Sequence, residues 1–117
     1  MPVSRGDIIL AFVEDVGSTG GKIRPALIVQ SDRNNARLKE TIVAAITSNT
    51  SRVSESHQVL IDLTTPDGAA TGLLHNSAVR CERLHTIPQS DVRRVIGRLS
   101  PALVQQVNAS LRASLGI

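Results

Sequence analysis

The run Lys22-Ile23-Arg24-Pro25-Ala26-Leu27-Ile28-Val29 places a basic segment directly before an unbroken apolar stretch. Short apolar runs rich in branched side chains are typical of buried β-strands. Proline cannot donate a hydrogen bond to a sheet, so Pro25 is expected at the first position of a strand or at a sheet edge. The run therefore predicts a strand over 26–30, with Arg24 at its rim.

Further strand-like segments lie on both sides of this run and are separated by polar, turn-rich stretches, among them the glycine-rich loop 17–21. The predicted strands cover residues 8–13, 41–46 and 57–63, followed by 77–81 and 84–87, which form two short strands or one bent strand.

The C-terminal segment has the signals of a helix. Ser100 can cap its first turn, Pro101 suits its first position, and Gly116 suits its end. Leu103, Val104, Val107, Leu111 and Leu115 form one apolar stripe. The pattern predicts a mainly β fold, a small barrel of five to seven strands packed against one helix, and a single domain over residues 1–117.

The composition favours an anionic partner. The chain has a net charge of +3 and a pI near 10.0, and only Lys22 and Lys39 among its 13 basic residues are lysines. The arginine guanidinium offers a planar donor fork that matches phosphate. Aromatic residues make up 1% of the chain, which argues against a nucleic-acid reader that works mainly by stacking bases on rings.

Metals, cofactors and membranes are not expected. Cys81 is the single cysteine, so neither an internal disulfide nor a zinc framework can form. The three histidines have no ligand-like spacing with one another or with Cys81. The apolar run 8–13 is too short for a signal peptide or a membrane span. We therefore expect a cytoplasmic protein without metal or cofactor.

Several polar residues at strand ends are candidate site residues. Thr47 and Ser48 follow an apolar strand, where hydroxyls either contact a phosphate or cap a turn. Arg80 and Glu82 share one strand face, as a catalytic pair or as a surface ion pair. His85 is either a proton donor or a partly exposed strand histidine.

Taken in order, five blocks of the chain resemble the MazF/PemK toxin family. They are Arg5-Gly6-Asp7-Ile8, Arg24-Pro25-Ala26-Leu27-Ile28-Val29, Ile46-Thr47-Ser48, Val79-Arg80-Cys81-Glu82 and Ile96-Gly97-Arg98-Leu99-Ser100. The resemblance implies a homodimer of CcdB-like, SH3-like barrels that cuts single-stranded RNA at short motifs without a metal. It also implies an acidic antitoxin protein as a partner.

The resemblance assigns an active-site role to Arg24 and Thr47. In the Kid branch of the family, the arginine and the acidic residue of a Val-Arg-Cys-Asp stretch are catalytic, and they correspond to Arg80 and Glu82. Glutamate replaces aspartate here. The first loop, residues 14–19, also departs from the family pattern, so no role in base recognition is carried over to it.

We therefore expect the 2′-OH of RNA to attack its own phosphate, with Glu82 as general base. Arg24 and Arg80 would stabilise the phosphorane, and Thr47 would orient the phosphate. Lys22, Ser48, Arg83 and His85 are predicted RNA contacts, with His85 also a possible proton donor. The expected products carry a 2′,3′-cyclic phosphate and a 5′-OH.

Two alternatives remain open. One is a CcdB-type poison that binds a topoisomerase through its C-terminal helix and cuts nothing. The other is an RNA-binding barrel that has lost its activity, which would show salt-sensitive RNA binding without cleavage.

Overall fold

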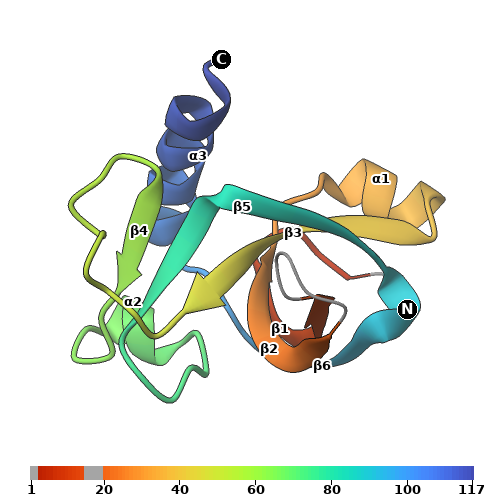
Figure 1. Cartoon of the computed structure of the whole chain (residues 1–117), viewed down its shortest axis with the longest axis horizontal. Helices are drawn as coiled ribbons and strands as arrows, with labels where there is room; N and C mark the ends of the chain where they lie inside the picture. The colour runs from red at the N-terminus through yellow and green to blue at the C-terminus, as the bar shows by residue number, and fades with distance from the viewer. Residues whose placement is uncertain (1–2, 15–19) are drawn as a thin grey trace.

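The structure, a computed structural model, describes residues 3–14 and 20–117 as a curled antiparallel sheet with a long helix beside it (Figure 1). The elements are β1 (Asp7–Glu14), β2 (Gly21–Ile28), α1 (Asp32–Arg37), β3 (Glu40–Thr47), β4 (Gln58–Ile61), α2 (Pro66–Ala69), β5 (Ser77–Pro88), the 3-10 turn η1 (Gln89–Asp91), β6 (Val92–Arg98) and α3 (Pro101–Leu115). The predicted mainly β fold with a C-terminal helix is confirmed.

The sheet has six strands in the order β4-β5-β3-β2-β1-β6, and each neighbouring pair is antiparallel. Within the described ranges, the edge strands β4 and β6 do not pair with each other, so the sheet curls without closing. None of the helices described is long and apolar enough to cross a membrane.

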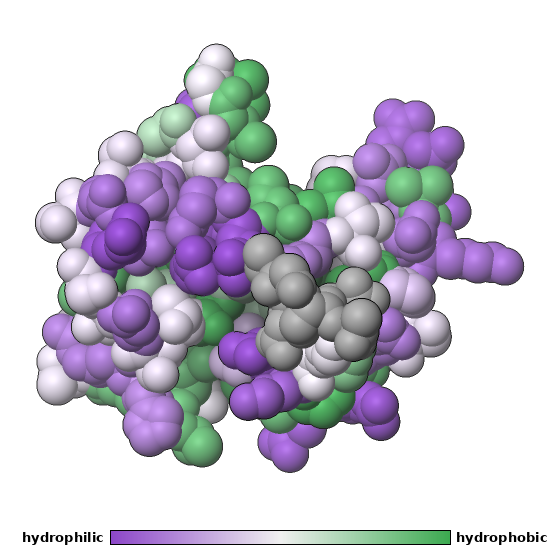
Figure 2. Space-filling view, viewed as in Figure 1, coloured by the Kyte–Doolittle hydropathy of each residue, from purple (hydrophilic) through white to green (hydrophobic). Residues whose placement is uncertain are grey.

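Alternating strand residues fill two cores on opposite faces of the sheet. Ile8 and Leu27 pack toward α3, where Leu103 and Val107 are buried against them. Ile9 and its neighbours belong to a second cluster, inside the curl of the sheet. This alternation has a period of two, as expected of strands that are buried on both faces. Apolar surface remains at the free end of α3, where Leu115 and Ile117 are exposed (Figure 2).

The structure differs from the sequence expectations at several strand ends. β2 begins at Gly21, so Pro25 lies inside the strand, but the pairing with β3 starts only at Ala26. Pro25 is therefore unpaired on the side that faces β3. It occupies a local sheet edge, one of the two positions expected for it. Residues 77–88 form one bent strand, β4 is shorter than expected, and the polar segment 31–37 contains α1. Residues 17–19 of the predicted loop 17–21 lie outside the described residues.

Two of the sequence blocks behind the family resemblance meet in the fold. The guanidinium of Arg98 forms an ion pair with the buried carboxylate of Asp7. The backbone N–H of Leu99 donates to the carbonyl oxygen of Gly6 at 2.9 Å, and Gly6 donates to the carbonyl of Ile28. These contacts hold the start of β1 against the end of β6, so both blocks serve the fold.

Gly97 is expected to tolerate no side chain. A Cβ atom there would lie 2.3 Å from the backbone of Thr71 and 2.6 Å from the carbonyl oxygen of Ala70. Gly97→Ala should therefore lower the free energy of unfolding by about 3 kcal/mol or more, because backbone atoms cannot move aside cheaply. Chemical denaturation measures this change.

Gly116→Ala is the matched control, because its Cβ meets nothing within 4 Å and only its positive φ of 72° opposes it. We expect a loss of about 1 kcal/mol there. Equal losses at the two positions would contradict the close packing of β6 on residues 70–72.

Candidate functional site

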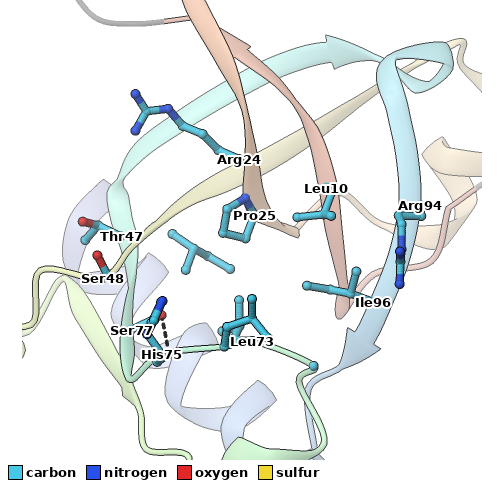
Figure 3. A pocket seen from close by; sticks show the side chains of 13 residues that line it. Leu10, Arg24, Pro25, Thr47, Ser48, Leu73, His75, Ser77, Arg94 and Ile96 are labelled. Atoms are coloured by element: carbon cyan, nitrogen blue, oxygen red, sulfur yellow. Dashed lines mark hydrogen bonds between the residues drawn. The ribbon is translucent and has the colours of Figure 1, made fainter.

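A cavity of about 490 Å³ opens beside the ends of β2 and β3 (Figure 3). Its polar and charged lining comes from Arg24, Thr47, Ser48, His75, Ser77 and Arg94. Its apolar lining comes from Leu10, Pro25, Ile46, Leu73, Leu74 and Ile96. This volume lies in the range of sites that bind small ligands, about 300–1,000 Å³. Among the described residues, none that lines the cavity carries a carboxylate, so this lining is suited to an anionic group.

The register of β2 with β3 explains why Arg24 and Thr47 share this cavity. The last paired residues are Ala26 and Ala45. Two residues further along the same register, Arg24 stands opposite Thr47, at the point where the strands have stopped pairing. The separation of the strands opens the space between them, and both side chains line it (Figure 3). The predicted association of Arg24, Thr47 and Ser48 therefore matches the geometry.

Thr47 takes the turn-capping role that was considered from the sequence. Its Oγ1 accepts a hydrogen bond from the backbone N–H of Asn49 at 3.1 Å, so the hydroxyl caps the turn after β3. A hydroxyl that accepts one bond still has its own O–H to donate. Thr47 also lines a second, smaller cavity, and so it stands where the two cavities adjoin.

The smaller cavity measures about 120 Å³ and is lined by polar side chains only: Thr47, Asn49, Ser51, Arg52, Gln58 and Arg80. Register places Arg80 between Ala45 of β3 and Gln58 of β4. Water occupies roughly 30 Å³ per molecule in the liquid, so this space holds a group no larger than a phosphate and a hydroxyl. Arg80 is thus beside Thr47 but outside the large cavity.

Glu82 lies behind Arg80 and is bound to it. Its Oε2 accepts from Arg80 Nε at 3.0 Å and from Gln58 Nε2 at 3.2 Å. Partial burial raises the pKa of this carboxyl, but hydrogen bonds from its own backbone, Arg80 and Gln58, together with the Arg80 charge, outweigh burial and lower it below the ordinary 4.5. Glu82 is therefore ionised at neutral pH, as a base must be.

The remaining predicted RNA contacts lie outside both cavities. Lys22 is exposed on β2, and His85 is half-buried opposite Val43. Arg83 falls in the irregular part of β5 where the pairing with β3 skips from Arg80 to Leu84. None of the three lines either cavity.

The sequence analysis did not select several polar cavity residues, among them Gln58, His75 and Arg94. Gln58 was expected only as part of a strand, His75 lies in a polar loop, and Arg94 lies on β6, which no alternating pattern announced. The adjacent pair Arg93-Arg94 gives no sign of which residue faces the site. Only the register of β6 with β1 distinguishes them.

Neither a metal site nor a reactive thiol is evident in the part of the chain that is described. No group of three or more His, Cys, Asp or Glu side chains in residues 3–14 and 20–117 is arranged to hold a metal ion. Cys81 is buried, and burial together with the nearby Glu82 charge raises the pKa of its thiol. A protonated, buried thiol is a poor nucleophile.

Known proteins match this chain along nearly its whole length. A family model of PemK-like, MazF-like toxins of type II toxin–antitoxin systems matches residues 4–115. The chain is 34% identical over 119 residues to endoribonuclease MazF6 of Mycobacterium tuberculosis, and the match covers 100% of both chains. It is 30% identical over 118 residues to endoribonuclease EndoA of Bacillus subtilis, which covers 100% of this chain and 97% of the relative.

Solved structures show the same fold. A Mycobacterium tuberculosis toxin, MazF-mt6, superimposes with a TM-score of 0.75 at 24% identity, covering 95% of this chain and 97% of the other. A mycobacterial endoribonuclease in complex with its cognate antitoxin gives a TM-score of 0.76 at 22% identity, covering 98% and 96%. The sequence match along nearly the whole chain and the shared fold together show that this chain belongs to the PemK/MazF family of type II toxin–antitoxin toxins.

Proposed function

We propose that this chain is an endoribonuclease that cleaves single-stranded RNA, mRNA in particular, at short sequence motifs and without a metal. The observation that carries the proposal is that Arg24 and Thr47 line one cavity, whose described lining has no carboxylate. Its relatives' names as endoribonucleases support the same activity.

In the proposed reaction, the scissile phosphate is bound at Thr47, between the two cavities. The Thr47 O–H donates to one non-bridging oxygen, and the guanidinium groups of Arg24 and Arg80 stabilise the charge that grows on the phosphorane. Arginine holds its proton too strongly to act as the acid. Both arginines therefore act electrostatically.

Displacement at phosphorus needs the attacking and the leaving oxygen on opposite sides of the phosphorus atom, and the two adjoining cavities provide these sides. The 2′ oxygen attacks phosphorus as the bond to the 5′ oxygen breaks, and the two oxygens lie roughly in line. We assign the attacking 2′-OH to the side of the smaller cavity, where Arg80 and Gln58 of the lining both donate to Glu82, the proposed acceptor of the 2′-OH proton. The leaving 5′ oxygen then faces the large cavity, where His75 rather than His85 is placed to donate a proton.

We further propose that the protein is the toxin of a toxin–antitoxin pair, acts as a homodimer in the cytoplasm, and is inhibited by an acidic antitoxin. One similar structure is of an endoribonuclease with its cognate antitoxin. The cationic cavity provides the charge that would attract an acidic segment, and disordered acidic segments can fold on binding.

Analysis of the product ends tests the reaction. We expect a 2′,3′-cyclic phosphate on one fragment and a 5′-OH on the other. Fragments with a 5′-phosphate would rule out attack by the 2′-OH. RNA that stays intact would favour one of the two alternatives. An inactive RNA-binding barrel would still bind the RNA, whereas a CcdB-type topoisomerase poison would not.

A further inference from the structure

Arg94 lies on β6 at the wall of the large cavity, across Pro25 and Leu10 from Thr47 (Figure 3). In the sheet, Arg94 pairs with Leu10, and Leu10 pairs with Pro25, so the three side chains share one face. Neighbouring strands lie about 4.8 Å apart, so Arg94 and Pro25 are separated by roughly 10 Å of sheet.

Arg94 is exposed and has no acidic partner among the described residues, whereas Arg98 is paired with Asp7 and Arg80 with Glu82. An exposed guanidinium in a cavity whose described lining has no carboxylate is suited to an anionic ligand. The described lining contains no Phe, Tyr or Trp, so Arg94 offers a cationic contact rather than stacking on one of these rings.

The cavity floor beside Arg94 is apolar. Leu10, Pro25 and Ile96 form it in the close view (Figure 3). A nucleoside can rest on such a surface while the phosphates on either side of it meet cations. The cavity volume of about 490 Å³ accommodates a group of that size.

We propose that Arg94 binds the phosphate immediately 3′ of the cleaved bond, so that the large cavity holds the nucleotide that carries the leaving 5′ oxygen. This inference rests on the proposed function, which directs the leaving oxygen into this cavity. Arg94 is then a substrate-binding residue that makes the same contact before and during the reaction.

The test compares Arg94→Ala with Arg93→Ala, its exposed neighbour on β6, which does not line the cavity. We expect Arg94→Ala to raise KM by roughly tenfold and leave kcat nearly unchanged, because a uniform binding contact is lost. The dependence of RNA binding on salt should fall by about 0.7 in log–log slope, the value for one phosphate contact on a single strand. Arg93→Ala should change KM by less than about twofold.

A scan with single methylphosphonate linkages, which are neutral, locates the contact. The wild-type protein and Arg94→Ala should bind the RNA with equal affinity when the neutral linkage is the first one 3′ of the cleavage site. Their affinities should differ when the neutral linkage is at any other position. Equal effects of the Arg93 and Arg94 substitutions would overturn the proposal, as would a loss restricted to one base identity, which indicates base recognition. RNA that binds but is never cut would refute the proposed function, while the difference between the two variants would still decide the role of Arg94.

Discussion

Arg24→Ala is expected to slow RNA cleavage by at least ~100-fold, the effect of removing one preorganised donor from a developing oxyanion. Arg24 stands opposite Thr47 where β2 and β3 separate, so its charge lies at the proposed phosphate site. The loss should fall mainly on kcat, since the charge on the phosphorane is greater than on the bound substrate. Single-turnover cleavage of one defined RNA measures it.

Arg33→Ala provides the control for net charge. Arg33 is an exposed arginine on α1 and lines neither cavity. We expect its removal to leave the cleavage rate within about twofold and to reduce RNA binding only slightly. Arg24→Lys should recover part of the rate, because it keeps the charge but loses the guanidinium fork. If Arg24→Ala and Arg33→Ala had the same activity, Arg24 would have no role in the chemistry.

Glu82→Gln is the second large effect, with an expected loss of about 100-fold or more for removal of a general base. Glutamine keeps the shape of the side chain and can still accept from Arg80 and Gln58 through its amide oxygen, but it cannot take a proton from the 2′-OH. A wild-type rate would show that Glu82 only positions Arg80.

The pH dependence of the cleavage rate distinguishes the proposed base from the proposed acid. Protonation of the base lowers the rate at low pH, and deprotonation of the acid lowers it at high pH. A base must be deprotonated, and the pKa of Glu82 is lowered below 4.5, so a Glu82 base loses activity only as the pH falls below that region. An imidazole acid must be protonated, so His75 as the acid predicts a rate that falls as the pH rises. A rate that instead falls as the pH drops while Glu82 is still ionised would contradict these two assignments.

Much of the architecture was predictable from local sequence patterns. The strands around Ile9 and Val43 and the capped helix after Ser100 follow from apolar periodicity and from residues that begin a helix. The helix α1 was not predicted, because its six residues lack an apolar stripe, and it is held by Asn35, which is buried. Its hydrogen bonds with Gln30 and Thr41 are side-chain contacts, which apolar periodicity does not encode.

The candidate site was only partly predictable for the same reason. Thr47 ends β3, whereas Arg24 lies inside β2 beyond its last pair with β3, and their types suggested phosphate binding, but their meeting depends on how β2 pairs with β3. Arg80 pairs with both Ala45 and Gln58, just past the register shift between Ala44 and Ala45, and Glu82 accepts a hydrogen bond from Gln58. Arg94 joins the site through pairing of β6 with β1, across more than 80 residues of sequence.

Incubation of the purified protein with a mixed-sequence single-stranded RNA in excess EDTA tests the central claim most directly, with the cut sites mapped and the fragment ends identified. The account predicts cleavage at a short motif, a 2′,3′-cyclic phosphate at the new 3′ end, and loss of this cleavage in Arg24→Ala. RNA that stays intact across many sequences, or cleavage that Arg24→Ala retains in full, would contradict it.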